Sequence, residues 1–336
     1  MLKALLNACE VEFTFDTVTP TLVKEGRYDQ NKAGKQMPAA VFQCHDTEHA
    51  LYDKVRTGRL EQLQIFIPGS SLRGVFRSHM ERIARTLSPQ NPIACNPFVE
   101  EGASDAAAPG AGEPSCSSRK LSYALSCPIC RIFGSTTQAG RIAFDPAEPV
   151  AGNRWAVDKS AQIAIDRFAG SVRFGPFTLM LVTGARFKTK VRIRNFELWQ
   201  LGLLGYVFRD LARSEVQIGM GRNLDRGRIG GKELNVKIEV SYFGRDASVP
   251  RDGSLRGLYE LTSDAAKQQY GLVARADRAG LPGLLTVGEM QPENLEHSFA
   301  VDSIDGFWRA TTNAWNEAVD QSAFTGRMAR AAGGQP

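Results

Sequence analysis

The sequence contains little that membrane proteins, secreted proteins or most enzymes require. No apolar run approaches the roughly 20 residues of a membrane-spanning helix. Residues 1–13 carry Glu10 and Glu12 where a signal peptide would be apolar. Six cysteines in 336 residues are too sparse for a disulfide scaffold. We therefore expect a soluble, cytoplasmic protein without a membrane partner.

Side chains that commonly carry catalysis are also scarce. The chain has only four histidines: His45, His49, His79 and His297. It has no G-x-S-x-G elbow, no H-E-x-x-H helix and no Walker loop. Asp29 and Asp46 stand in an early irregular segment, where they could hold a metal that promotes strand cleavage, although such aspartates are usually turn formers. We predict no catalytic centre, with Asp29 and Asp46 as the alternative.

The overall charge is small. Forty-one basic residues against 36 acidic ones give a net charge of +5. An excess of this size does not by itself indicate a nucleic-acid partner, so local clusters of charge must decide the matter.

Residues 67–74 predict the start of a helix that can hold an anion. They read I-P-G-S-S-L-R-G and lead into an amphipathic run. Ser70 or Ser71 can cap this helix, and the amides of its first turn then lack carbonyl partners and can bind a phosphate. Arg73 and Arg77 lie one turn apart beside this site, off the apolar stripe. The alternative is an ordinary capped helix with solvated arginines.

A second cluster is a strand with one wholly cationic face. In residues 185–194 the even positions are basic: Arg186, Lys188, Lys190, Arg192 and Arg194. Alternate side chains on a strand lie roughly 6.6 Å apart, which is close to the repeat of a nucleic-acid backbone. A phosphodiester chain could follow this ladder. The alternative is a solvated face or a set of paired ion bridges.

A third cluster mixes glycine with arginine. Residues 219–231 read G-M-G-R-N-L-D-R-G-R-I-G-G. Glycines such as Gly219 and Gly221 let a backbone approach a ligand closely, and Arg222, Arg226 and Arg228 can contact phosphates or stack on bases. The segment is not a dinucleotide-binding loop, because a leucine occupies the position of the third glycine. A plain glycine-rich turn is the alternative.

Four of the six cysteines have a spacing typical of a structural zinc site. These are Cys95, Cys116, Cys127 and Cys130, and the last two form a C-P-I-C pair. A metal bound to them would tie down the low-complexity loop at 99–118 and would serve folding rather than catalysis. Two alternatives remain: buried free thiols, or a site in which Cys44, His45 or His49 replaces Cys95 or Cys116.

The order of predicted elements indicates an α+β fold. A strand at 11–15, the helix after residue 69, short strands at 141–144 and 162–165, and longer strands at 177–182 and 185–193 are followed by a buried helix at 196–213 and a strand at 234–242. Thr183-Gly184 is predicted to be a hairpin turn between the two longer strands. This order fits a ferredoxin-like core with long insertions.

We expect that core to span residues 1–245, with a first insertion at 16–66 and the cysteine-rich loop at 95–135. Residues 246–336 would form a C-terminal extension, with a helix at 303–318 and a disordered tail from residue 326.

Four segments of the chain, in this order, resemble the RAMP superfamily, specifically the repeating backbone subunit of type III and type IV CRISPR effector complexes. They are I-P-G-S-S-L-R-G at 67–74, C-P-I-C-R-I-F-G-S at 127–135, I-D-R-F-A-G at 165–170 and the glycine/arginine segment at 219–231. The resemblance spans about residues 9–243.

The resemblance implies a modified RNA-recognition-motif fold that polymerises along a guide RNA. It also implies a thumb-like hairpin at about 150–185 that kinks the guide, with Arg167 and Phe168 near it. The partners would be guide RNA, copies of the protein in a helical filament, other effector subunits, and a complementary DNA or RNA target. Together with the cationic strand, this gives the following candidate RNA-binding residues: Ser70, Ser71, Arg73, Gly74, Arg77, Arg167, Phe168, Arg186, Lys188, Lys190, Gly219, Gly221, Arg222, Arg226 and Arg228.

The chain departs from the type III pattern in the first insertion. Type III subunits usually carry an aspartate there that cleaves target RNA, but residues 13–26 read F-T-F-D-T-V-T-P-T-L-V-K-E-G and no aspartate aligns. We therefore predict a type IV-like, non-cleaving subunit. The alternatives are a metal-dependent endoribonuclease, or a guide-processing endonuclease with His45 or His49 as the base.

Overall fold

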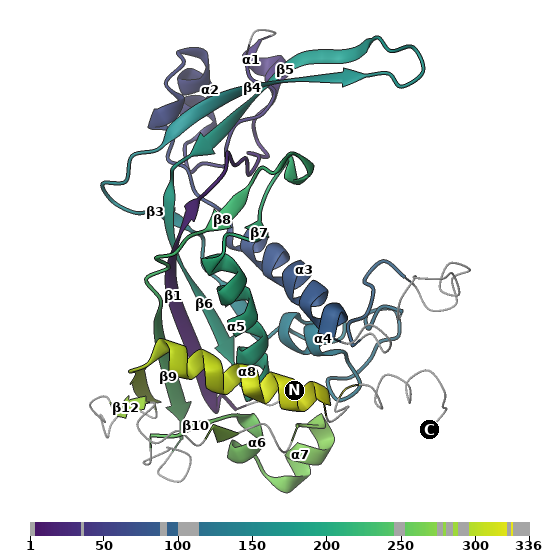
Figure 1. The fold of residues 1–336 in the computed structure, drawn as a ribbon, viewed down its shortest axis with the longest axis vertical. Coiled ribbons are helices and arrows are strands. Elements are labelled where there is room, and N and C mark those ends of the chain that lie inside the picture. Colours follow the sequence, from purple (N-terminus) through teal and green to yellow (C-terminus); the bar gives the residue numbers. More distant parts are fainter. Residues whose placement is uncertain are drawn as a thin grey trace.

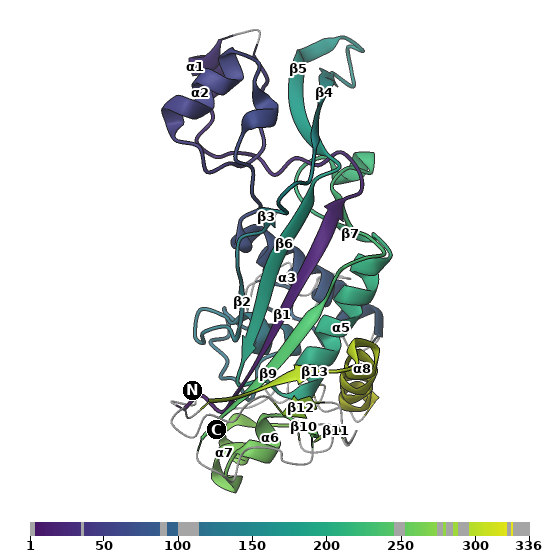
Figure 2. The ribbon, with the colours of Figure 1, turned by 90° about the vertical axis from the view of Figure 1, so that its left-hand side faces the viewer.

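The computed structural model describes residues 4–34, 37–87, 93–99, 114–244, 253–273, 278–279, 285–287, 296–320 and 324. The molecule is elongated, and its two longest core strands run along the long axis (Figures 1 and 2). Most of the low-complexity loop and the tail from residue 326 lie outside the described residues, so the expectations for them stay predictions.

The centre of the molecule is an antiparallel sheet covered by helices. Its middle has the strand order β9-β1-β6-β2. The elements concerned are β1 (Asn7–Thr17), α3 (Gly69–Leu87), β2 (Ile142–Phe144), β6 (Arg186–Arg194), α5 (Leu198–Ala212) and β9 (Lys237–Phe243). The chain visits them as strand, helix, strand, strand, helix, strand. This topology is ferredoxin-like, as the sequence predicts.

The alternation of β1 decides which face of the sheet the helices cover. Its odd residues are buried and its even residues are half-exposed. Phe13 lies with its ring 6.3 Å from that of Phe76 on α3 and 4.9 Å from that of Phe208 on α5. The two helices therefore share one apolar face, and the even residues of β1 and β6 form the open face of the sheet.

Short elements extend the sheet and the loops around it. They are β3 (Glu148–Pro149), β7 (Val216–Gln217), β8 (Arg228–Gly230), β10 (Leu255–Arg256), β11 (Arg278–Ala279), β12 (Leu285–Val287), β13 (Glu296–Val301), η3 (Arg222–Leu224), α4 (Pro128–Phe133), α6 (Leu258–Leu261) and α7 (Asp264–Tyr270). β3 pairs with β6, and β8 pairs with both β1 and β7.

One end of the molecule is a separate lobe, at the top of Figure 1. It consists of α1 (Gln30–Ala33), α2 (Glu48–Arg56), η1 (Leu60–Gln62) and a long hairpin of β4 (Ala156–Ile165) with β5 (Val172–Thr183). The first insertion is joined to the hairpin by backbone hydrogen bonds, such as Thr21 N–H to the Val182 carbonyl (2.9 Å). The hairpin implied by the resemblance is therefore present.

The prediction of a hairpin turn at Thr183-Gly184 is wrong. β5 pairs with β4, whereas β6 pairs with β1, β2 and β3 in the main sheet. The junction is held by Thr17 of β1, whose amide donates to the Ala185 carbonyl (2.8 Å) and whose hydroxyl accepts from the Ala185 amide (2.9 Å). The chain thus continues from one sheet into the other instead of reversing.

The C-terminal extension completes the core. β13 pairs with β9, and α8 (Ile304–Asp320) packs along α5, where Trp308 stacks on Phe208 at 5.0 Å. The helix predicted at 303–318 is therefore present. Within the described residues, no helix is both long enough and apolar enough to span a membrane.

Candidate nucleic-acid interface and metal centre

Two motifs that are far apart in the sequence meet at one groove. The start of α3 and the loop from β7 to β8 line an open hollow of ≈ 380 Å³. We call it the α3 groove, and its lining residues are Val23, Ser71, Gly74, Val75, Ser78, Ile218, Gly219 and Arg222. Small side chains on α3 thus leave room for a ligand beside a guanidinium group. Ser78 was absent from the candidates, although its helical spacing from Ser71 and Gly74 is a signal that could have found it.

The α3 helix begins one residue before the expected cap. It starts at Gly69, and the Pro68 carbonyl accepts from the amides of Ser71 (2.9 Å) and Leu72 (3.2 Å). The prediction that Ser70 or Ser71 caps the helix is therefore wrong, because both lie inside the first turn. Ser70 is exposed, and Ser71 lies on the face of the helix that lines the groove.

The glycine/arginine loop owes its shape to packing within the chain. Gly219 has φ +79°, and a Cβ atom there would lie 2.2 Å from the Leu22 carbonyl oxygen. Only glycine fits such a close approach at a positive φ. The neighbouring Met220 amide donates to that same carbonyl at 2.9 Å. The expected close approach of backbone is present, but here it is made to the first insertion.

The three arginines of this loop have different surroundings. Arg226 donates to the Ser160 hydroxyl of β4 (2.7 Å), and Arg228 pairs with Asp225 (3.2 Å). Arg222 is exposed at the edge of the groove, and among the residues that the structure describes no carboxylate pairs with it. Arg222 is therefore available to an anionic ligand, whereas Arg226 fixes the loop to the hairpin. Gly221 immediately precedes η3 and lies against the side chain of Arg226.

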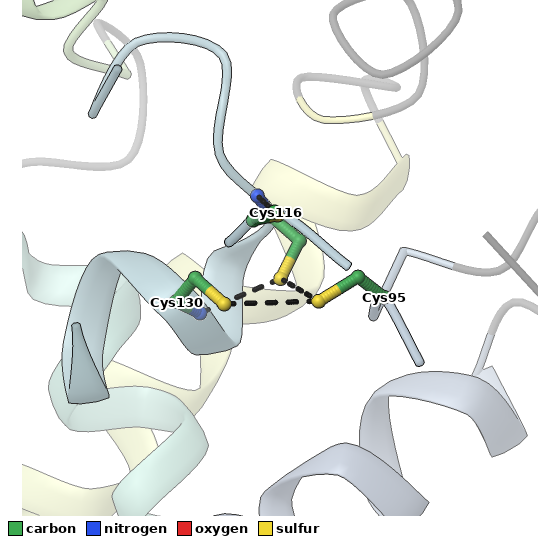
Figure 3. A group of neighbouring side chains, drawn as sticks. Cys95, Cys116 and Cys130 are labelled. Atoms are coloured by element: carbon green, nitrogen blue, oxygen red, sulfur yellow. Dashed lines mark hydrogen bonds between the residues drawn. The ribbon is translucent and has the colours of Figure 1, made fainter. Parts of the chain in front are cut away.

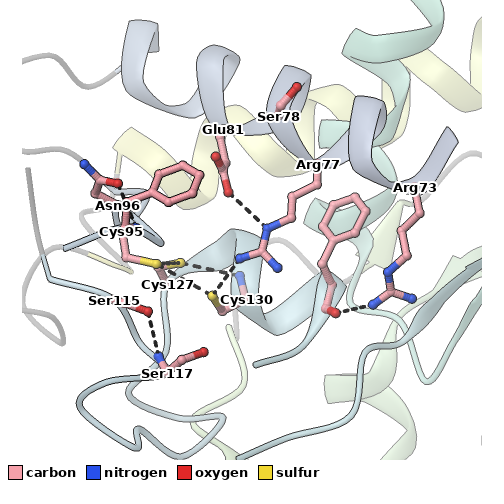
Figure 4. A network of polar contacts seen from close by, with 12 residues as sticks. Arg73, Arg77, Ser78, Glu81, Cys95, Asn96, Ser115, Ser117, Cys127 and Cys130 are labelled. Atoms are coloured by element: carbon pink, nitrogen blue, oxygen red, sulfur yellow. Dashed lines mark hydrogen bonds and ion pairs between the residues drawn. The ribbon is translucent and has the colours of Figure 1, made fainter. Parts of the chain in front are cut away.

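Arg73 and Arg77 project away from the groove, toward the cysteines (Figure 4). Arg73 donates to the carbonyls of Ile142 (2.9 Å) and Phe133. Arg77 pairs through Nε with Glu81 (3.1 Å) and donates through Nη2 to the Cys130 sulfur (3.6 Å). Both arginines therefore have protein partners. Glu81 lies four residues after Arg77 on the same helix, but Cys130, Phe133 and Ile142 come from other segments and could not be read from the sequence.

The four predicted cysteines come together as a closed, buried cluster. All four sulfur atoms of Cys95, Cys116, Cys127 and Cys130 lie within 4.8 Å of one another. The Cys95 sulfur is 3.7 Å from those of Cys127 and Cys130. Figure 3 shows Cys95, Cys116 and Cys130 with their sulfur atoms directed toward one another. A tetrahedral zinc with bonds of about 2.3 Å places its sulfurs about 3.8 Å apart, so the donor set fits such an ion.

The alternative ligands are elsewhere. Cys44 contacts the Glu25 carboxylate (3.7 Å), His45 contacts Glu148 (2.8 Å), and His49 lines a separate hollow on α2. Hydrogen bonds from the three other thiols lower the pKa of Cys95. Because the protein supplies all four ligands of a tetrahedral ion, such a site has no open position for a substrate.

Four of the five basic residues on the cationic strand face are paired with carboxylates of β1 or with Asp145, which follows β2. The exposed Arg194 has no carboxylate partner among the residues that the structure describes. The pairs are Arg186 with Asp16 (2.7 Å), Lys188 with Glu12 (2.8 Å), Lys190 with Glu10 (2.5 Å), and Arg192 with Glu10 (2.6 Å) and Asp145 (2.7 Å). The hydrogen bond from Lys188 helps to lower the pKa of Glu12, so that pair is charged. The structure therefore matches the paired ion bridges that stood as the alternative.

The two candidate aspartates both have partners within the protein. Asp46 is buried, where it accepts from Lys54 (2.5 Å) and from the Gln64 amide (2.7 Å). Asp29 caps α1 by accepting from the Asn31 amide (2.9 Å). Across the described residues, the four-cysteine cluster is the one group of three or more ligand residues close enough to hold an ion.

The hairpin tip carries the two residues that the resemblance placed near it. Arg167 and Phe168 lie in the turn between β4 and β5, where Asp166 accepts from the amides of Phe168 (2.9 Å) and Ala169 (3.0 Å). Phe168 is fully exposed, and Ile163, Ile165 and Val172 are more than half exposed. Such an apolar tip indicates a surface that contacts a partner.

His79 is a packed residue with a polar partner that the sequence does not reveal. It is 5% exposed and lies 2.7 Å from the Asp210 carboxylate, which joins α3 to α5. It takes no part in the groove.

Comparison with known proteins agrees with the sequence motifs. The profile of the RAMP superfamily matches residues 14–232, which is more than half of the chain and includes α3, the cysteines and the glycine/arginine loop. No curated protein matches the chain. The chain belongs to the RAMP superfamily, a family of CRISPR-associated RNA-binding proteins.

Proposed function

We propose that this protein is a backbone subunit of a CRISPR effector complex, in which copies line up along the guide RNA and present it for pairing with a target. The α3 groove would hold the guide. The observation that carries the proposal is that α3 and the glycine/arginine loop, two of the family-like segments, line one hollow with Arg222 at its edge.

The chemistry of the groove suits a sugar-phosphate backbone. Ser71 and Ser78 offer hydroxyl groups, Gly74 leaves the helix surface open, and Arg222 supplies a positive charge. None of these groups forms the flat, apolar slot that recognises one particular base. Binding would therefore be independent of sequence and sensitive to salt, and base pairing by the guide would select the target.

The hairpin supports the assembly part of the proposal. Its tip projects from the body of the molecule (Figure 1), and the apolar side chains of Ile163, Ile165, Phe168 and Val172 are exposed there beside the exposed Arg167 and Arg173. We propose that this tip contacts the guide RNA and the adjacent copy in the filament. An isolated subunit would leave these side chains in water, which is unfavourable by about 25 cal/mol per Å² of apolar surface.

We also propose that the subunit does not cleave its target, as in type IV-like complexes. Asp46 is buried in an ion pair, and Asp29 has no second acidic residue grouped with it in the described part of the chain. The test is to incubate the assembled complex with labelled complementary RNA and Mg²⁺. Evenly spaced fragments that vanish in Asp29→Ala or Asp46→Ala would contradict the proposal and favour the endoribonuclease alternative.

The most direct test of guide binding uses natively purified protein. We expect an absorbance ratio at 260 and 280 nm typical of bound nucleic acid, and RNA of discrete length after extraction. Arg222→Ala should reduce the slope of log K against log salt by about one unit, because one phosphate contact is lost. Protein that is monomeric, free of nucleic acid and indifferent to added RNA at low salt would contradict the proposal.

A further inference from the structure

We propose that Arg77 is an outer-shell hydrogen-bond donor to a metal held by the four cysteines, and that metal occupancy thereby sets the position of α3 and the RNA affinity of the α3 groove. The part that concerns RNA rests on the proposed function. The part that concerns the metal stands on the geometry of the cluster alone.

Arg77 is the side chain of α3 that reaches a cysteine sulfur. Its Nη2 lies 3.6 Å from the Cys130 sulfur, and its Nε is paired with Glu81, whose side chain is only 10% exposed. Arg85 is anchored in the same network, because it donates to the Cys95 carbonyl (2.9 Å) and contacts Glu81 (3.6 Å). Figure 4 shows Arg77 pointing from α3 into the cluster.

The charge of the loaded cluster explains why a donor is needed there. Four thiolates around a divalent ion carry a net charge of −2, and all four cysteines are buried. A buried charge requires compensation by hydrogen bonds or by opposite charge. Arg77 supplies a hydrogen bond, and together with Arg85 it brings two positive charges to the network against the one negative charge of Glu81. Outer-shell donors of this kind orient the ligands and commonly change metal affinity 10- to 100-fold.

The same helix presents a different side to the groove. At about 100° per residue, Arg73 and Arg77 lie about 130° and 90° around α3 from the centre of the stripe of Ser71, Gly74 and Ser78. The guanidinium group of Arg77 is directed to Cys130 on the cluster side. Arg77 therefore cannot serve the cluster and the groove at once. On the cluster side, Arg73 also donates a hydrogen bond to the Phe133 carbonyl at the end of α4, the helix that carries Cys130.

This arrangement couples the two sites through one rigid element. A bound metal fixes Cys127 and Cys130, and hence α4, and the two arginines then hold α3 in its place beside the glycine/arginine loop. Without the metal, the four buried thiols are no longer held together by a common ion, and α3 loses its support on that side. Energetic coupling between two sites through a shared packed element is typically 5- to 150-fold.

The first experiment measures metal release from zinc-loaded protein into a chromophoric chelator. Arg77→Met should release zinc about tenfold faster than the wild type, and Arg77→Lys, which keeps a charged donor, should fall between the two. Arg82→Met is the matched control, because Arg82 lies on the same helix but contacts His79 (2.8 Å). Equal release from wild type and from a folded Arg77→Met protein would overturn the role of Arg77.

The second experiment measures RNA affinity before and after zinc is removed, with circular dichroism to verify folding. We expect roughly five- to tenfold weaker binding without zinc, restored by Zn²⁺ but not by Mg²⁺. If both forms bind RNA equally, the coupling is wrong and the proposed function stands. If neither form binds RNA, both the proposed function and the coupling are contradicted. The zinc release rates still decide the role of Arg77.

Discussion

Gly74→Glu is expected to abolish most of the RNA affinity without harming the fold. A Cβ atom at Gly74 would have no other atom within 4 Å, so a longer side chain fits into the groove. Glycine inside a helix costs about 1 kcal/mol relative to alanine, so replacing it should not destabilise α3. The new carboxylate would stand about 6 Å from the nearest phosphate, where repulsion amounts to about 0.7 kcal/mol in water and about 3 kcal/mol at an effective dielectric constant of 20.

These energies correspond to a loss of about 3- to 100-fold in affinity. The assay is fluorescence anisotropy with a labelled single-stranded RNA, and Gly74→Gln is the control because its new side chain has the same size without the charge. The glutamine variant should bind nearly as well as the wild type. The gap between the two variants should shrink from 0.1 M to 1 M salt, as screening shortens from about 10 to 3 Å. Equal binding by both variants at low salt would refute the assignment of the groove.

Three further outcomes follow from other parts of the structure. Lys190→Ala should change the salt slope of RNA binding less than Arg222→Ala does, because Lys190 is already paired with Glu10. The reverse order would indicate that RNA binds the cationic strand face instead of the α3 groove. Asp46→Asn should lower the free energy of unfolding by about 3 kcal/mol in urea titrations, since it leaves Lys54 without its buried partner, and a change below about 1 kcal/mol would show that the pair is not structural. Burial raises the pKa of Glu25, but hydrogen bonds from Arg27 and the Cys44 amide outweigh it and lower that pKa to about 2. A depressed pKa stabilises the protein above pH 4.5, and this stability is lost as the pH falls toward 2, so the melting temperature of the wild type should fall more than that of Glu25→Gln between pH 5 and 3. Parallel melting curves would contradict the shift.

The sequence predicts best what depends on local pattern. The alternation of β1 and the apolar stripe of α3 are visible in the residues themselves, and they lead to the ferredoxin-like core. The C-P-I-C pair, with Cys95 and Cys116 at suitable distances along the chain, predicts the metal cluster because the ligand types are few and their chemistry is restrictive.

Features that depend on long-range pairing could not be read in advance. Five like charges at 186–194 look like a polyanion site until the topology places Glu10 and Glu12 of β1 beside them. Thr183-Gly184 has the composition of a turn, and the chain does bend at Gly184 (φ +72°), yet Thr17 holds Ala185 so that β6 joins the main sheet instead of pairing with β5. Arg73 and Arg77 have the spacing of phosphate ligands, but α4 approaches from a distant segment and engages both.

Photo-crosslinking would test the central claim most directly. A guide-length RNA that contains 4-thiouridine is bound to the protein at low salt and irradiated, and the attached peptides are identified by mass spectrometry. We predict crosslinks in residues 69–78 and 218–226, the two segments that supply most of the lining of the α3 groove. Crosslinks confined to 8–16 and 186–192 on the open face of the sheet, or none above background, would contradict the account.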